Sequence, residues 1–314
     1  MNAAQEQRGR LLEKLKRELG PVVLAALDNP KVVEIMLNPD GCLWLDVAGE
    51  GMIDTGATLP AHQAMSAMST IAAMLETVVT LDKPILEGEL PLDGSRFEGV
   101  IPPNAPAPMF AIRKKAVLIY TLADYVKQGI MTDVQADTIK AAVAARENIL
   151  IVGSTGSGKT TLANALLHEI GSTDGRVVII EDTVELQCSA RNLVSLRTSE
   201  TTDMIRLLRA TMRLRPDRIV VGEVRGGEAL ALLKAWNTGH PGGCATVHAN
   251  SARAGLIRLE QLIQEAGVPP QPQLIAEAIN VIVSIQRAHG GRKIQEVCRV
   301  VGWQENGGYE LQTL

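Results

Sequence analysis

The pattern of apolar positions in the first third of the chain predicts a small domain of mixed helices and strands. Apolar residues at helical spacing over residues 8–19 predict an amphipathic helix that ends at Gly20. Short apolar runs separated by turn residues predict strands over residues 33–55, and the alanine-rich stretch 61–79 predicts a second helix. The proline-rich stretch 101–108 can form neither a helix nor a central strand, so it is expected to be a surface loop.

Further along, a strand over residues 110–119 and a short connector lead to a region with a different rhythm. From residue 133, apolar strands alternate with longer helices, which is typical of a parallel sheet covered on both faces. We therefore expect an α/β fold with two domains, an amino-terminal α+β domain over residues 1–120 and a larger α/β core over 121–314, joined by a connector at about 119–132. The strands of the core are predicted over 149–152, 177–180, 219–221, 244–248, 281–286 and 294–303, and its helices over 202–213, 227–237 and 254–266.

The first strand of the core ends in a glycine-rich turn that opens onto a helix, as in a phosphate-binding P-loop. Its glycines allow successive backbone N–H groups to face one pyrophosphate at the positive end of that helix. Lys159 can reach the β and γ phosphates, and Thr160 offers a hydroxyl to Mg²⁺. A nucleoside triphosphate with Mg²⁺ is thus the predicted ligand. The residues predicted to bind it are Gly153, Ser154, Thr155, Gly156, Ser157, Gly158, Lys159, Thr160 and Thr161.

Carboxylates follow the next two strands of the core. Asp182 and Glu185 come after one strand, and Glu223 comes after the other. Since the carboxyl ends of parallel strands face the ligand crevice, these acids are candidates for holding Mg²⁺ and for activating water. Glu223 is the preferred base, and Asp182 is the preferred carboxylate for Mg²⁺, although all three residues are eligible for that role. The alternative interpretation is a set of solvated charges at strand ends.

His248 ends the strand that follows the Glu223 strand in sequence. A histidine in isolation is more often structural than catalytic. Its position at the end of this strand reverses that preference, because its ring and Thr246 can lie beside the γ phosphate and respond to its presence. His240, in a glycine-rich turn, is a weaker candidate.

Composition narrows the classes of protein that remain. The chain has 314 residues, of which 46% are hydrophobic and 21% are charged, as in ordinary globular proteins with two domains. Its net charge of −4 gives no overall attraction for nucleic acid. No apolar stretch is long enough to cross a bilayer and the first residues do not resemble a secretory signal, so we expect a protein that is cytoplasmic or peripheral on the cytosolic face of the inner membrane. The four cysteines form no CxxC pair, and we expect reduced, structural thiols.

Four segments in order resemble the conserved boxes of the type II and type IV secretion ATPases, also called traffic ATPases. They correspond to the Walker A box, the acidic box, the atypical Walker B box and the histidine box of that family, and span residues 153–160, 180–186, 215–226 and 239–249. Two amino-terminal segments, 93–97 and 110–114, extend the resemblance over nearly the whole chain. Within the family, the sequence is most similar to the conjugative-transfer ATPases of type IV secretion systems.

The resemblance implies an ATP-hydrolysing motor that powers pilus assembly or substrate transfer. It implies a homohexameric ring, built from a PAS-like amino-terminal domain and a RecA-like core that bind ATP and Mg²⁺ between them. Inner-membrane components of a secretion or conjugation apparatus are the implied partners. Arginines of the amino-terminal domain act on phosphates in this family, and Arg96 and Arg113 occupy the matching positions. The resemblance does not fix whether they act in cis or in trans, and Arg113 could instead be a solvated charge on an edge strand.

Two other functions are compatible with a P-loop core. A RecA-like helicase would need a basic channel with aromatic side chains, but the chain contains only three Trp, three Tyr and two Phe. Direct, sequence-specific binding of nucleic acid is therefore not expected. A small-molecule P-loop kinase would need a lid and an acceptor pocket, and neither is recognisable in the sequence.

Overall fold

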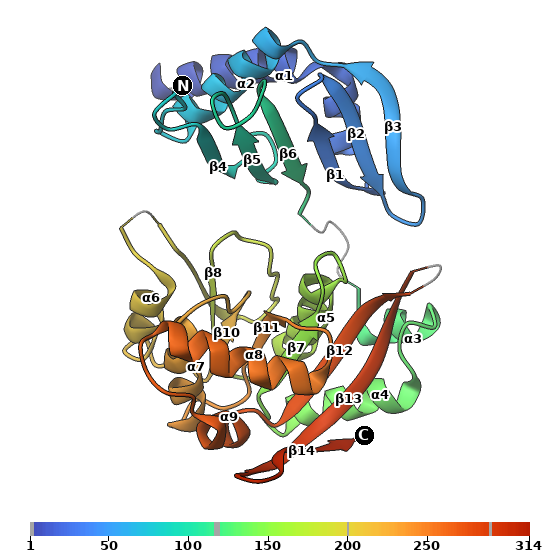
Figure 1. Cartoon of the computed structure of the whole chain (residues 1–314), viewed down its shortest axis with the longest axis vertical. Helices are drawn as coiled ribbons and strands as arrows, with labels where there is room; N and C mark the ends of the chain where they lie inside the picture. The colour runs from blue at the N-terminus through green and yellow to red at the C-terminus, as the bar shows by residue number, and fades with distance from the viewer. Residues whose placement is uncertain (1–2, 116–119, 200, 289–290) are drawn as a thin grey trace. The chain divides into compact units, whose positions relative to one another are not determined.

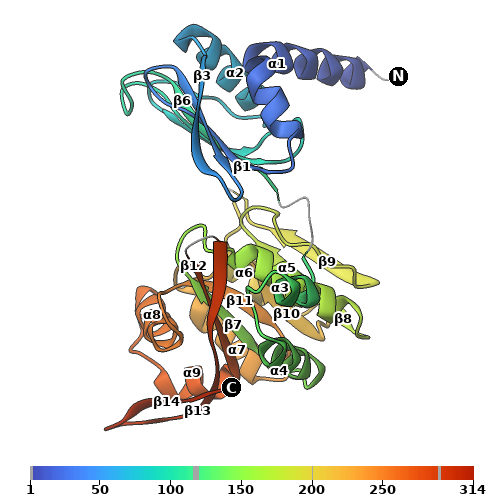
Figure 2. The ribbon, with the colours of Figure 1, turned by 90° about the vertical axis from the view of Figure 1, so that its right-hand side faces the viewer.

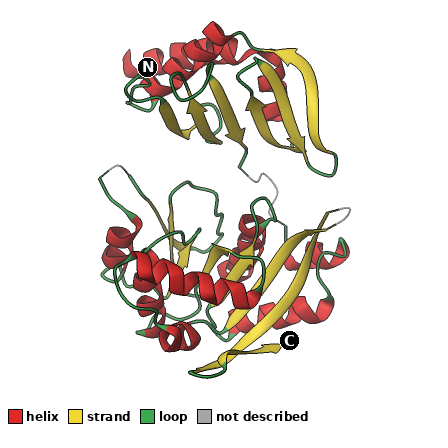
Figure 3. Cartoon of the chain, viewed as in Figure 1, coloured by secondary structure: helices red, strands yellow, loops and turns green. Residues whose placement is uncertain are grey.

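The chain forms two compact units, Met1–Val117 and Leu118–Leu314. The computed structural model describes residues 3–115, 120–199, 201–288 and 291–314. Each unit contains a sheet and its own helices, labelled in Figure 1 and coloured by type in Figure 3. In the described part of the chain, no helix is both long enough and apolar enough to cross a membrane.

The first unit is built on a six-stranded antiparallel sheet in the order β3-β2-β1-β6-β5-β4. Alternate residues such as Ile35, Phe97 and Ile112 are fully buried, which is the period expected of strands with one face on a core. Helices α1 and α2 supply the other side of that core (Figure 2). The elements are α1 (Ala3–Asp28), β1 (Val32–Leu37), β2 (Cys42–Val47), β3 (Gly51–Thr58), α2 (Ala61–Met74), β4 (Ile85–Glu89), β5 (Arg96–Val100) and β6 (Met109–Arg113).

Helix α1 does not end at Gly20, as the sequence predicted, but kinks there and continues to Asp28. Gly20 has a φ of 79°, a left-handed conformation that glycine adopts without steric cost. Pro21 then begins the second helical segment, where the missing N–H of proline does no harm. The prediction failed because a Gly-Pro pair can separate two packed helical segments as well as terminate one.

Strand β6 is shorter than the predicted strand over residues 110–119, since it ends at Arg113. Residues 116–119 of that prediction lie outside the described residues. The strand pairs with β1 on one side and β5 on the other, so Arg113 lies at the end of a central strand and not on an edge strand. Arg96 is its direct partner across the β5–β6 pair.

The second unit contains an eight-stranded sheet in the order β14-β13-β12-β7-β11-β10-β8-β9. The strands from β12 to β9 are parallel, and β13 and β14 add an antiparallel edge. The elements are α3 (Leu122–Lys127), α4 (Asp133–Ala144), β7 (Ile149–Gly153), α5 (Lys159–Gly171), β8 (Arg176–Glu181), β9 (Asn192–Arg197), α6 (Met204–Thr211), β10 (Arg218–Val221), α7 (Glu228–Asn237), β11 (Cys244–His248), α8 (Ala252–Glu265), α9 (Pro272–Ala278), β12 (Val281–Ala288), β13 (Gly291–Gln304) and β14 (Gly308–Thr313).

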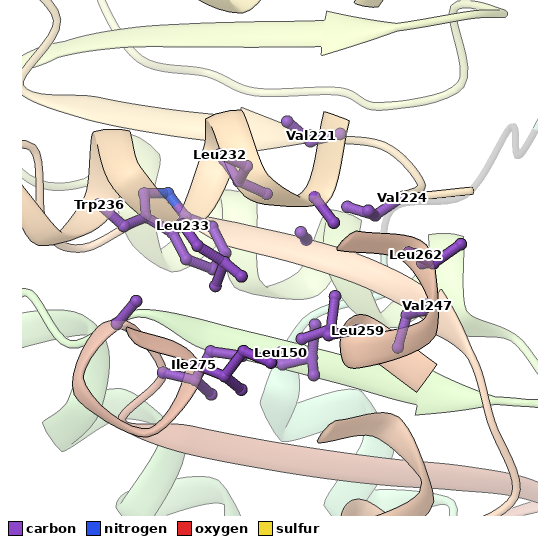
Figure 4. Packing of buried hydrophobic residues seen from close by; sticks show 14 of the residues in the cluster. Leu150, Val221, Val224, Leu232, Leu233, Trp236, Val247, Leu259, Leu262 and Ile275 are labelled. Atoms are coloured by element: carbon purple, nitrogen blue, oxygen red, sulfur yellow. The ribbon is translucent and has the colours of Figure 1, made fainter. Parts of the chain in front are cut away.

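Helices cover both faces of this sheet, which confirms the predicted α/β fold. Helices α6 to α9 pack on one face against Leu150, Val221 and Val247, part of the core drawn in Figure 4. Helices α3 to α5 pack on the other face against the alternate strand residues, among them Ile151 and Val220. Burial on both faces explains why these strands read as continuous apolar runs. All four cysteines are free thiols, as expected.

Candidate active site

The loop between β7 and α5 has the backbone required of a phosphate-binding turn. Gly156 and Gly158 have φ values of 67° and 98°, which side chains other than glycine rarely adopt. A Cβ on Gly153 would collide with the carbonyl oxygen of Ile285 on β12. Gly158 is the N-cap of α5, and no side chain caps the helix there. The first N–H groups of α5 thus lack a side-chain acceptor, and an anion is their natural partner.

The side chain of Lys159 folds back onto this loop. It is buried, with 8% of its surface exposed. Its Nζ donates to the carbonyl oxygens of Gly153, at 2.9 Å, and Ser154, at 3.1 Å. The ammonium is therefore part of the loop's own framework. The same ammonium is 3.5 Å from the Nδ1 atom of His248.

The imidazole of His248 bridges the P-loop and the end of β10. Its Nε2 lies 2.9 Å from the Thr155 hydroxyl, and its Nδ1 lies 3.2 Å from Oε1 of Glu223. An ionised carboxylate can only accept hydrogen bonds, so a neutral ring carries its hydrogen on Nδ1. The Nε2 atom then accepts from the Thr155 hydroxyl. A change at Thr155 can therefore reach Glu223 through one side chain.

Glu223 lies two residues after the end of β10, and its carboxylate is held by Arg225 and His248. Arg225 donates to its Oε2 through Nε, at 2.9 Å, and through Nη2, at 2.5 Å. Burial acts to raise the pKa of Glu223, but the hydrogen bonds and charge of Arg225, the bond from His248 and the charge of Lys159 outweigh it and hold the pKa below its ordinary value. The carboxylate is thus ionised at neutral pH and can accept a hydrogen bond from water.

The acidic segment after β8 lies on the other side of Arg225. Asp182 accepts a hydrogen bond from the Thr198 hydroxyl at 3.0 Å, and its carboxylate is 3.8 Å from Arg225. Glu181 is buried, and its Oε1 accepts from the backbone N–H groups of Glu185 and Leu186. Glu181 therefore shapes the segment that carries Asp182 and Glu185, rather than facing solvent.

The side-chain oxygen atoms near the P-loop are of the kind that binds Mg²⁺ together with a nucleotide. Among the described residues, no group of three or more His, Cys, Asp and Glu side chains is arranged to hold a metal ion alone. Mg²⁺ commonly takes one or two protein oxygens together with phosphates and water. Thr160, in the first turn of α5, and the carboxylates of Asp182 and Glu185 are oxygen donors of that type.

The structure joins Lys159, Thr155, His248 and Glu223 by direct contacts, and Arg225 connects Glu223 to Asp182. The sequence analysis assigned no role to Arg225. Its position two residues after the predicted base was the feature of the sequence that could have indicated one.

Two other predicted residues of the second unit, Thr246 and His240, have different hydrogen-bond partners. Thr246 is 2% exposed, and its hydroxyl donates to the carbonyl of Gly222, so it ties β11 to β10. His240 contacts the carbonyl of Pro216 at 2.9 Å. Arg96 and Arg113 belong to the first unit, where they are register partners on the adjacent strands β5 and β6.

Residues 59–310 match the family described as type II/IV secretion system protein, and the chain belongs to that family. It is a secretion-system ATPase of the type IV and conjugal-transfer kind, and hence an ATP hydrolase. The chain is 51% identical over 306 residues to a probable conjugal transfer protein TrbB of Sinorhizobium fredii. The aligned residues cover 97% of this chain and 94% of the relative.

It is also 33% identical to the type IV secretion system protein PtlH of Bordetella pertussis, over 90% of this chain and 92% of that protein. The fold is similar to the crystal structure of the ATPase DotB of Legionella pneumophila, with a TM-score of 0.61 and 20% identity, over 90% of this chain and 80% of that one.

Proposed function

We propose that this chain is a cytoplasmic motor that hydrolyses ATP at the P-loop of its second unit and thereby powers pilus assembly or substrate transfer in a conjugation apparatus. The observation that supports this most strongly is the contact chain from Thr155 through His248 to Glu223. It joins the loop predicted to hold the phosphates to the carboxylate predicted to activate water. A change in phosphate state can therefore alter the positions of two strand ends.

In this proposal the residues of the loop have separate roles. The N–H groups of residues 153–161 and the ammonium of Lys159 hold the β and γ phosphates. Glu223 orients the attacking water and accepts its proton. Thr160 holds Mg²⁺ with Asp182 as the first candidate among the carboxylates and Glu185 as the second. When bound, Mg²⁺ neutralises charge on the phosphate oxygens.

We further propose a domain division near residue 120, with a PAS-like amino-terminal domain and a RecA-like core at 121–314 that assemble into a hexameric ring. Such a ring would dock on inner-membrane components from the cytosolic side. The test is the mass in solution by light scattering, with and without ATP and Mg²⁺, together with phosphate release in the presence and absence of EDTA.

The expected results are a sixfold mass and hydrolysis that requires Mg²⁺. A monomer with nucleotide bound would favour a P-loop kinase. Hydrolysis stimulated many-fold by DNA would favour a helicase. Either result would contradict the proposal.

Arg96 and Arg113 are proposed as the arginines that act on the phosphates from the first unit. They are direct partners on β5 and β6, and like charges placed opposite each other destabilise a sheet unless an anion lies between them. Among ion pairs between described residues, none includes either arginine. A phosphate is a suitable partner for such a pair.

Mixing of variants tests whether Arg113 acts on the ATP of a neighbouring subunit. Arg113→Ala and Lys159→Met should each be inactive alone. In a trans arrangement, rings that contain both variants regain part of the hydrolysis, because some interfaces combine an intact loop with an intact arginine. Subunit exchange is verified in the same sample by fluorescence transfer between labelled subunits. Substantial hydrolysis by pure Arg113→Ala would exclude Arg113 and leave Arg96 as the candidate.

A further inference from the structure

The hairpin of β12 and β13 places two arginines against the P-loop. Arg287, near the end of β12, donates through its Nε to the carbonyl oxygen of Gly156 at 3.2 Å. Its cross-strand partner Arg292 lies so close to Gly158 that a Cβ there would be 2.8 Å from the arginine Cδ. The hairpin reaches the loop because β12 pairs directly with β7, as Figure 1 shows.

No acidic side chain in the described part of the chain forms an ion pair with either arginine. Both side chains are exposed. Two cations opposite each other on adjacent strands destabilise a hairpin in the absence of a compensating ligand. Arg287 uses its Nε for the loop carbonyl, and its side chain remains exposed, so the guanidinium can also contact a ligand bound at the loop.

The order of strands indicates which end of a nucleotide this hairpin would meet. The residues proposed to act on the γ phosphate are Glu223, which follows β10, and His248, which ends β11, and both strands lie on one side of β7. Strand β12 lies on the opposite side of β7. A triphosphate that lies along the P-loop with its γ end toward Glu223 has its nucleoside end toward the hairpin.

We propose that Arg287 binds the nucleoside half of ATP, with its guanidinium plane stacked on the purine ring and Arg292 beside it. This inference rests on the proposed orientation of ATP at the P-loop. A guanidinium stacks on any flat aromatic ring, so the contact provides affinity for purines without reading the groups at their edges. It gives a physical basis for nucleoside binding in a chain whose sequence contains no base-reading motif.

The test compares ligands with and without a nucleoside. Equilibrium binding of ATP, ADP and inorganic tripolyphosphate is measured by calorimetry for the wild-type protein and for Arg287→Ala, Arg287→Lys and Lys293→Ala. Lys293 is an exposed cation on the same hairpin, so its removal is a matched control for charge.

Arg287→Ala should weaken ATP and ADP by roughly 3- to 30-fold while leaving tripolyphosphate within about twofold. Arg287→Lys should fail to restore the loss, because lysine keeps the charge but lacks the planar face. Lys293→Ala should bind all three ligands as the wild type does. GTP should lose as much affinity as ATP in Arg287→Ala.

Two results would overturn the assignment. An equal loss for tripolyphosphate would make Arg287 a phosphate ligand, and unchanged binding of all ligands would make it a structural support of Gly156. Lys159→Met separates this inference from the proposed function. If that variant binds ATP and tripolyphosphate normally, the P-loop assignment itself is wrong; if it loses both, the result for Arg287 decides the inference alone.

Discussion

Replacement of His248 by alanine should stop turnover while leaving nucleotide binding nearly intact. The ring is the direct contact between the P-loop hydroxyl of Thr155 and the carboxylate of Glu223. Without it, each of these side chains loses one hydrogen bond, and Glu223 keeps only its bonds from Arg225. The groups that hold the phosphates, the loop N–H groups and Lys159, are unchanged.

The size of each effect follows from the contacts. The side chain of His248 is 48% exposed, so its two hydrogen bonds contribute about 1 kcal/mol to the free energy of unfolding. Folded domains are stable by about 5–15 kcal/mol, and the variant should therefore remain folded. Loss of one hydrogen-bonding group aligned for the transition state commonly costs about 10²- to 10³-fold in kcat, and a loss of this order is expected here.

The assay combines phosphate release under saturating ATP, equilibrium binding of a fluorescent ATP analogue and a thermal midpoint. His240→Ala is the matched control, since that ring contacts the Pro216 carbonyl and none of the P-loop residues described. The control should turn over within about twofold of wild type. If His248→Ala kept wild-type turnover, or lost ATP affinity as severely as kcat, the role of the ring as a bridge would be refuted.

Two further predictions concern the groups around His248. Lys159→Met should abolish ATP binding. It should also lower the free energy of unfolding by about 1–3 kcal/mol, because the hydrogen bonds from the ammonium to Gly153 and Ser154 are lost. Detectable hydrolysis with a normal denaturation midpoint would contradict this prediction. The pKa of Glu223 is lowered in the folded state. Its pairing with Arg225 therefore stabilises the folded protein at pH values above the ordinary glutamate pKa of about 4.3. This stabilisation is lost as the pH falls through the lowered pKa of the folded state. The gap in thermal midpoint between the wild type and Arg225→Ala should accordingly narrow below that pH, and a gap that widened with acid would contradict the pairing.

Much of the second unit could be predicted from sequence because its strands are buried on both faces. Continuous apolar runs marked β7, β8, β10 and β11, and the residues that follow each run identified the strand ends that carry chemistry. Strand β9 was missed because it is half exposed and its residues Asn192–Arg197 form no apolar run.

Contacts between distant segments could not be predicted in this way. The bond between Arg287 and Gly156 joins residues 131 positions apart, and it depends on β12 lying next to β7 rather than on any local pattern. The burial of Lys159 likewise follows from the fold of the loop around its own carbonyl groups. Arg225 was within a recognised segment, but its pairing with Glu223 is a property of side-chain geometry.

The central claim, that Glu223 activates water for ATP bound at the P-loop, is tested most directly by single-turnover cleavage of labelled ATP in Glu223→Gln. Glutamine keeps the shape of the side chain but cannot accept the proton. ATP affinity near that of the wild type, with cleavage slowed by about 10²- to 10⁴-fold, is the predicted result. Cleavage at the wild-type rate would contradict the claim, and so would a loss of affinity as large as the loss of rate, which would make Asp182 or Glu185 the better candidate for the base.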